Sequence, residues 1–92
     1  MKLINWNKEK NIWLKEKRGI SFEDILYYLD NDKLIDDTEH PNQQKYRGQR
    51  IMVIDIKGYV YLVPYVETKD EIFLKTIIPS RKATRKYLGD LK

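Results

Sequence analysis

The chain has 92 residues with a formal net charge of +4, one histidine and no cysteine. This length leaves room for one hydrophobic core, so we predict a single domain over residues 1–92. The lack of cysteine excludes disulfides, thiolate metal sites and thiol nucleophiles, and a single histidine argues against a zinc site, so we expect no metal and no cofactor.

The composition is that of a folded protein outside the membrane. Apolar residues make up 41% of the chain and charged residues 35%, which is too apolar for a disordered polymer. No apolar run approaches the roughly 20 residues that span a bilayer, and the start of the chain lacks the apolar stretch of a secretion signal. We therefore expect a cytoplasmic location and no membrane contact.

Charge is distributed unevenly along the chain. Lys and Arg minus Asp and Glu gives +4 for residues 1–18, −6 for residues 19–40 and +4 for residues 81–92. Basic ends of this kind can form a cationic face that binds phosphate. The alternative is that they are ordinary solvated helix faces.

The first predicted helix covers about residues 8–17. Asn5 or Asn7 can cap its start, because an asparagine side chain accepts a hydrogen bond from a free N–H group of the first turn. Gly19 ends the helix, since glycine readily adopts the left-handed conformation that follows a last turn.

The large apolar side chains of this region are predicted to be buried. Ile12 and Trp13 lie on the helix and Trp6 lies just before it. Exposed tryptophans can stack nucleobases, but we expect all three side chains to face the core.

The second predicted helix begins at Ser21. Its hydroxyl is a capping group, and the acidic Glu23 and Asp24 suit the positive start of a helix. Ile20 can pack on Ile25 across the cap. Apolar residues then recur at i, i+3, i+4 and i+7, which predicts one buried face. That face consists of Phe22, Ile25, Leu26 and Leu29.

The middle of the chain has the period-two pattern of strands. After the second helix ends near Asn31, a polar stretch to Gln44 predicts a short strand and then a loop. Residues 51–56 and 59–63 form a predicted hairpin around a Lys-Gly turn, and residues 72–78 follow as a further strand. Pro79 ends that strand, so we predict an antiparallel meander of three to four strands.

The last predicted helix runs from a Ser80 cap to about Leu88, with Gly89 as its stop. The predicted fold is therefore α+β, with two N-terminal helices, an antiparallel sheet and one C-terminal helix.

This last helix places four cations at the positive end of a helix dipole, which is electrostatically unfavourable. Arg81 with Arg85 and Lys82 with Lys86 are also like-charged i, i+4 pairs. A bound phosphate or an acidic partner would offset this cost. Alternatively, the packing of the apolar side chains of the helix outweighs the repulsion.

Two further residues are candidates for chemistry. His40 is the one side chain with an ordinary pKa near neutrality, so it can act as a base or an acid, or it can simply be solvated. Arg50 can grip a phosphate or can pair with Asp36 or Asp37. Tyr61 and Tyr65 alternate on one face of a predicted strand and can stack bases, although half-buried sheet tyrosines are more common, so we expect both to belong to the core.

Three segments together resemble successive blocks of the BrnT toxin family. They are residues 6–11 (WNKEKN), 18–24 (RGISFED) and 77–85 (IIPSRKATR), in the family's order and over nearly the whole chain. Asn7 and Arg18 stand where the family usually has aspartate and histidine. The resemblance implies a RelE-like fold, an endoribonuclease that blocks translation, and a tight hetero-oligomer with a DNA-binding antitoxin.

The resemblance also implies roles for individual residues. Arg81 matches the arginine of the last block and Arg50 the sheet arginine, so both are expected to stabilise the transferring phosphate, while His40 moves protons. Cations on the first and last helices are expected to hold the RNA. They are Lys15, Lys17, Arg18, Lys82 and Arg85.

Two other function classes remain open at this point. The first is a non-catalytic interaction module whose basic surface docks an acidic protein or binds RNA without cutting it. The second is a small metalloenzyme, against which the composition argues. A steep salt dependence of RNA binding would indicate phosphate neutralisation.

Overall fold

The computed structural model describes residues 2–89 and contains three helices and six strands within them. The chain order is β1 (Leu3–Trp6), α1 (Lys8–Arg18), α2 (Phe22–Asp30), β2 (Leu34–Glu39), β3 (Gln49–Ile56), β4 (Tyr59–Glu67), β5 (Glu71–Leu74), β6 (Ile78–Pro79) and α3 (Arg81–Leu88). The predicted α+β class is confirmed, with more strands than expected.

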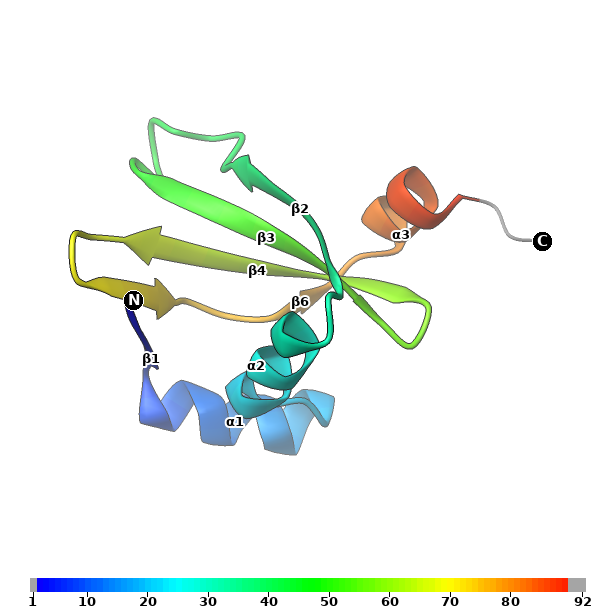
Figure 1. Cartoon of the computed structure of the whole chain (residues 1–92), viewed down its shortest axis with the longest axis horizontal. Helices are drawn as coiled ribbons and strands as arrows, with labels where there is room; N and C mark the ends of the chain where they lie inside the picture. Colours follow the sequence, from blue (N-terminus) through cyan, green and yellow to red (C-terminus); the bar gives the residue numbers. More distant parts are fainter. Residues whose placement is uncertain (1, 90–92) are drawn as a thin grey trace.

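One sheet lies at the centre of the molecule. Its strand order is β1-β5-β4-β3-β2, and β6 pairs with β4 beyond the end of β5. β1 runs parallel to β5, whereas all other pairs are antiparallel. Figure 1 shows α1 and α2 on one side of this sheet and α3 on the other.

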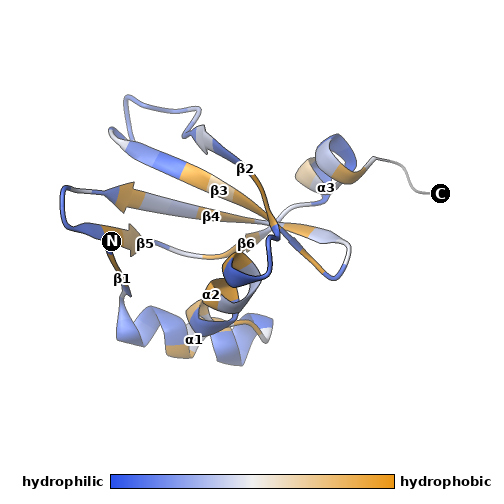
Figure 2. Ribbon diagram, in the orientation of Figure 1, coloured by the Kyte–Doolittle hydropathy of each residue, from blue (hydrophilic) through white to orange (hydrophobic). Residues whose placement is uncertain are grey.

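The face covered by α1 and α2, called the α1/α2 face, holds the main core. Side chains from both helices meet alternate residues of the central strands, because successive strand residues point to opposite faces. Figure 2 shows the apolar residues concentrated in α2 and the central strands, whereas α1 is mostly hydrophilic. The fully buried members include Leu14, Phe22, Ile25, Ile54, Val63, Leu74 and Ile77.

The opposite face, called the α3 face, holds a smaller cluster. Val53 and Val60 of the sheet and Ala83 of α3 are its buried members. Leu62 and Tyr87 pack against them while remaining half-buried. A face with so few buried side chains leaves room for a cavity beside the helix.

The predicted helix ends are confirmed in the structure. The Asn7 side chain accepts a hydrogen bond from the N–H of Lys10 at 2.8 Å, so Asn7 is the cap. Gly19 has a φ of 67°, the left-handed conformation that ends α1. Ser21 and Asp24 form a reciprocal capping box at the start of α2.

The strand β1 was not predicted from the sequence. It is paired with β5 from Leu3 opposite Glu71 to Trp6 opposite Leu74. Only four residues long and half exposed, it carries too short a pattern to be recognised alone. The predicted order of two helices, a sheet and a helix is therefore wrong at its beginning.

The predicted strand over residues 72–78 is broken into β5 and β6. Leu74 of β5 lies opposite Tyr65 of β4, and Ile78 of β6 lies opposite Leu62 of β4. The three residues between β5 and β6 therefore face only two residues of β4. Pro64 occupies the mismatch and has no N–H to continue the ladder. The chain therefore leaves the sheet after Leu74 and rejoins it just before α3.

The prediction that Ile12 and Trp13 face the core is wrong. Ile12 is 50% exposed and Trp13 is 39% exposed, because α1 turns Asn11 and Leu14 inward instead. Asn11 is buried between the helices, where its Oδ1 accepts the N–H of Phe22 at 2.7 Å. Because a polar residue occupies an inward position of α1, the spacing of the apolar residues does not show which face of the helix is buried.

Trp6 behaves as predicted, because it packs against the main core. Its ring stacks on that of Phe22, with the ring centroids 5.4 Å apart. The two tryptophans therefore have different environments, one against the core and one on the outer surface of α1.

Candidate functional site

A cavity of about 280 Å³ opens between α3 and the sheet. The sheet supplies an apolar floor, and α3 supplies one wall with its first turn and two lysines. The lining residues are Thr38, Pro41, Ile51, Val53, Leu62, Ser80, Lys82, Ala83, Lys86 and Tyr87. An apolar floor with convergent cations suits a flat, partly apolar group that carries a negative charge.

Main-chain groups of β4 fix the start of α3. The N–H of Ser80 donates to the carbonyl of Val60 at 3.0 Å, and the N–H of Val60 donates to Oγ1 of Thr84 at 2.9 Å. The Ser80 side chain also accepts the N–H of Ala83 at 3.0 Å, as predicted for a cap. The helix wall of the cavity is thereby held against the sheet.

A second contact ties the end of α3 to the edge strand β2. The Tyr87 hydroxyl donates to Oδ2 of Asp36 at 2.8 Å. This hydrogen bond holds the pKa of the Asp36 carboxyl below its usual range and raises the pKa of Tyr87. Tyr87 also lines the cavity. The contact was not predicted, since the two residues are 51 positions apart.

The four cations of α3 are divided between two sides of the helix. Lys82 and Lys86, one helical turn apart, line the cavity. Arg81 and Arg85 are exposed on α3 and are not among the lining residues. All four still contribute to the local positive potential, which adds to that of the helix start. Lys86 was part of the predicted cationic pairs but was not predicted to be a site residue.

His40 lies directly after β2, beside the cavity. Its neighbour Pro41 and its strand neighbour Thr38 are lining residues. The ring accepts the N–H of Asn42 at Nδ1, at 3.0 Å, and lies against the ring of Tyr46 with the centroids 4.3 Å apart. These contacts fix the ring and leave Nε2 as the nitrogen that a substrate can reach.

Arg50 lies on the α1/α2 face, away from the cavity. Arg50 and the buried Met52 are two residues apart on β3 and therefore point to the same face of the sheet, whereas Ile51, between them, points to the other face and lines the cavity. The Nε of Arg50 donates to Oδ1 of Asp37 at 3.1 Å, one of the two pairings left open by the sequence. The structure therefore does not bring Arg50 together with the cations of α3.

Asp37 also accepts a hydrogen bond from Tyr65, which lies opposite Arg50 in the ladder. The hydroxyl to Oδ2 distance is 2.6 Å. Burial, followed by the hydrogen bond to Asp37, raises the pKa of Tyr65 to about 12. Tyr65 is thus a buried structural residue, and Asp37, Arg50 and Tyr65 form one cluster on the α1/α2 face.

The predicted RNA-binding cations of α1 are also on the α1/α2 side of the sheet. Lys15 lies 4.0 Å from a carboxylate oxygen of Glu23, and Lys17 is exposed. The Arg18 guanidinium donates to the carbonyl of Ile77, in the connection that leads to α3. Within residues 2–89, no group of three or more His, Asp or Glu side chains is placed to hold a metal, and no helix is long and apolar enough to cross a membrane.

Comparisons with known proteins agree with this arrangement. Residues 6–86 match the family model described as "Ribonuclease toxin, BrnT, of type II toxin-antitoxin system". Among solved structures, the chain is similar to YafQ from E. coli strain BL21(DE3), with a TM-score of 0.52 and 17% identity over 90% of this chain and 98% of that one. This likeness supports the expected RelE-like fold. No sequence relative was found among curated proteins.

Proposed function

The chain belongs to the family of BrnT ribonuclease toxins of type II toxin-antitoxin systems, and from this membership we propose that it cuts RNA in the cytoplasm without a metal ion and thereby stops translation. The observation that supports this proposal best is the cavity at the start of α3. Its apolar floor suits a nucleobase, and Lys82 and Lys86 on its wall suit the adjoining phosphates.

Metal-free cleavage of RNA needs a base, an acid and cations. The base removes the proton of a 2′-hydroxyl, the 2′-oxygen bonds to phosphorus, and the 5′-oxygen leaves with a proton from the acid. The products are a 2′,3′-cyclic phosphate and a 5′-hydroxyl. Charge builds up on the phosphorane between these steps, so cations held close to it lower the barrier.

We assign these roles to residues around the cavity. His40, directly after β2, acts as the acid, because its Nδ1 accepts the N–H of Asn42 and the neutral ring therefore carries its proton on Nε2. His40 gives this proton to the leaving 5′-oxygen, and water takes the proton of the 2′-hydroxyl. Arg81 approaches the phosphate from the outer side of the α3 start, and Lys82 approaches it from the cavity wall. Arg85 extends the same cationic surface along the RNA backbone.

The position of Arg50 favours an indirect role over the predicted phosphate contact. Its guanidinium donates to the side chain and to the carbonyl of Asp37 in β2, the strand that His40 directly follows. We propose that it positions this end of β2. An Arg50→Lys variant tests this role, because lysine keeps the charge but loses the fork that binds both groups. If Arg50 positions His40, the variant changes the pH profile of cleavage, whereas loss of a contact to the transferring phosphate lowers kcat and leaves the pH profile unchanged.

The family also implies a partner. Type II systems pair a toxin with a protein antitoxin, so we propose that the chain forms a hetero-oligomer with a DNA-binding antitoxin. Covering the cationic α3 surface would block RNA access. Co-purification from cells that express both proteins tests the complex.

Cleavage of a labelled RNA in excess EDTA tests the main proposal. Wild type should give fragments with cyclic phosphate ends, and Arg81→Ala should reduce the rate at least about 100-fold. Lys69→Ala, which removes a cation from the β4–β5 turn, is the matched control and should cut as wild type does. A wild-type protein that neither cuts RNA nor arrests growth on induction would exclude the ribonuclease function.

A second function is favoured by one observation. The lining of the cavity contains lysines but no carboxylate and no histidine, so the groups best suited to proton transfer lie at its margin. This arrangement fits a basic module that binds RNA without cutting it. Such a module would bind the same RNA with a steep dependence on salt while leaving it intact.

A further inference from the structure

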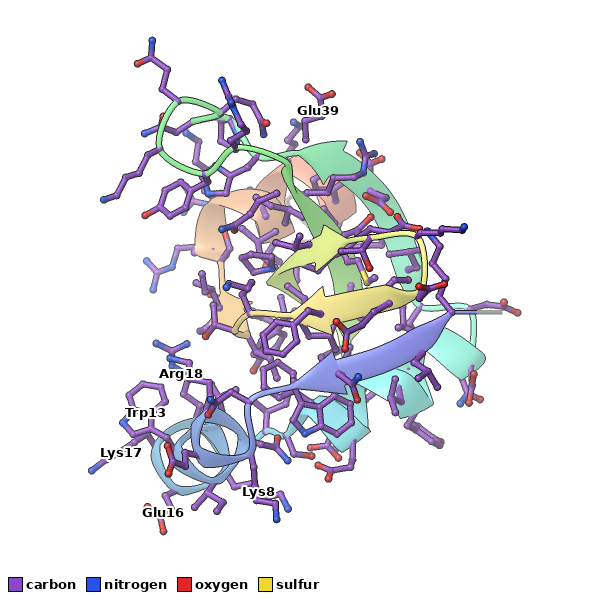
Figure 3. The ribbon with its side chains drawn as sticks, turned by 90° about the vertical axis from the view of Figure 1, so that its left-hand side faces the viewer. Lys8, Trp13, Glu16, Lys17, Arg18 and Glu39 are labelled. Atoms are coloured by element: carbon purple, nitrogen blue, oxygen red, sulfur yellow. The ribbon has the colours of Figure 1, made fainter. Side chains whose placement is uncertain are left out.

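The outer surface of α1 has features that the site at α3 does not explain. Trp13 is 39% exposed, and its neighbour Ile12 is 50% exposed. Figure 3 shows Trp13 and Lys17 projecting from the outer side of α1, whereas Arg18 turns toward the connection that carries Ile77. Large apolar groups placed among cations, and held away from the core, are typical of a surface that contacts another molecule.

Two cations lie against the Trp13 ring. The ammonium of Lys10 is 4.4 Å from the ring centroid and the guanidinium of Arg18 is 5.2 Å from it. Single-stranded nucleic acids are bound in this way, with a base stacked on an aromatic ring and the neighbouring phosphate held by a cation. Since a lysine ammonium at an exposed site is held only weakly, a base can displace Lys10 from the ring.

Arg18 is preorganised for such a contact. Its guanidinium donates to the carbonyl of Ile77, so the side chain is fixed before any ligand binds. Beyond Trp13, Arg18 also lines a second cavity of about 290 Å³, together with Lys57, Tyr28 and Tyr61. This cavity therefore continues the surface with a further cation and two further aromatic rings.

One carboxylate also lines the second cavity. Asp24 accepts the N–H of Ser21 at 2.9 Å as part of the capping box, so its charge is partly compensated by the start of α2. Along α1 five cations, Lys8, Lys10, Lys15, Lys17 and Arg18, outnumber two carboxylates, Glu9 and Glu16, so the helix has a net charge of +3 and favours a polyanion.

The α1 surface is separate from the α3 site but connected to it by the chain. Ile77, which holds Arg18, precedes the Ser80 cap of α3 by three residues, and β6 lies between them. A strand of RNA that passes the edge of the sheet at β6 can reach both surfaces. The two surfaces together would hold a longer stretch of RNA than the α3 cavity alone.

We propose that the outer face of α1 is a second binding surface for single-stranded RNA, on which Trp13 stacks a base and Arg18 binds the adjoining phosphate. The proposal rests on the proposed function in its choice of RNA as the ligand, but it does not depend on cleavage. An acidic protein, such as an antitoxin segment, is the competing occupant that the experiment must separate.

Tryptophan fluorescence with a short 2′-O-methyl oligonucleotide tests the proposal. This probe lacks the hydroxyl needed for cleavage, so binding is measured without turnover. We expect quenching of wild-type emission, whereas Trp13→Leu should lose the quenching and bind about tenfold more weakly. Arg18→Gln should reduce the slope of log affinity against log salt by about one. Tyr27→Ala, which removes an exposed ring from α2, is the matched control and should bind as wild type does.

Failure of this proposal differs from failure of the ribonuclease function. If Trp13→Leu and Arg18→Gln bind the oligonucleotide as wild type does, the α1 surface does not bind RNA, even if the same proteins cut RNA normally. Quenching by the antitoxin but not by the oligonucleotide would also overturn it. Arg81→Ala should retain the quenching while losing cleavage, which would show that the two surfaces act separately. Thermal unfolding of each variant confirms that the fold is intact.

Discussion

The two faces of the sheet are built differently. The α1/α2 face buries side chains from two helices and three strands, β3, β4 and β5, in one continuous cluster, whereas the α3 face buries only Val53, Val60 and Ala83. The α1/α2 face is closed, because the Asn11 side chain joins α1 to α2 by donating to the Glu23 carboxylate and accepting the N–H of Phe22. The α3 face is left open at a cavity with two lysines on its wall.

The difference indicates that the two faces contribute differently to stability and to binding. Burial of apolar area is the main favourable term in folding, so the α1/α2 face supplies most of the stability. The α3 face contributes little burial and is free to carry repelling cations. Changes to the buried side chains of the α1/α2 face should therefore affect stability, and changes to the cations of the α3 face should affect RNA binding.

The largest expected effect is on the stability of the α1/α2 face. Phe22→Ala should lower the free energy of unfolding by about 3–5 kcal/mol, because it opens a cavity beneath α2. Leu62→Ala, the comparable truncation on the α3 face, should cost less, since Leu62 is only half-buried. Urea unfolding measures both variants. Equal losses would contradict the division between the faces.

The next effect is on the α3 face and should leave stability unchanged. Replacing Lys82 and Lys86 together with glutamine should weaken RNA binding about 10-fold to 100-fold at low salt and reduce the salt slope by about two. The unfolding free energy should stay within about 0.5 kcal/mol, as for other surface substitutions. Filter binding over a range of salt concentrations checks this, with Lys69→Gln as the control. An unchanged salt slope would mean that neither lysine meets a phosphate.

A smaller loss is expected when the polar contact within the α1/α2 face is removed. Asn11→Ala should destabilise the protein by about 1–3 kcal/mol, because it leaves the N–H of Phe22 buried without a partner. The pKa of the Glu23 carboxyl, held below its usual range chiefly by Asn11, should also rise. Carboxyl NMR titration measures that shift. A variant as stable as wild type would show that Asn11 is replaceable by water.

The smallest effect concerns alkaline pH. The pKa of Tyr65 is raised to about 12, whereas an unfolded tyrosine ionises near pH 10. The folded state therefore binds this proton more tightly, and the resulting stability is present below about pH 10 and lost as the pH rises to about 12. Unfolding measured against pH should show this loss in wild type but not in Tyr65→Phe. The same loss in both proteins would assign the titration to another group.

The sequence predicted the parts of the fold that depend on local chemistry. Caps at Asn7, Ser21 and Ser80 and the turn around Gly58 were correct, because each depends on one residue and its immediate neighbours. The short strand β1 could not be predicted, since it exists only through pairing with a strand 68 residues later in the chain.

Site residues were harder to predict than elements. The side of the sheet on which Arg50 lies depends on the strand register, and the sequence alone left its pairing with Asp36 or Asp37 open. Trp13 was wrongly predicted to be buried. The face of α1 that turns inward is set by Asn11, which is buried because of a contact with α2 that the sequence does not show. Lys82 and Lys86 had the right spacing for a shared face, but only the packing of α3 shows that this face meets the cavity.

The attachment of α3 through Val60 has a consequence for how such a protein can evolve. Both bonds use the N–H and the carbonyl of the main chain at position 60, so any residue there except proline preserves them. Only Thr84 contributes a side chain to this anchor. Mutational drift can therefore exchange the outward residues of α3 while the helix stays in place, so that the chemistry of this surface can change without loss of the fold.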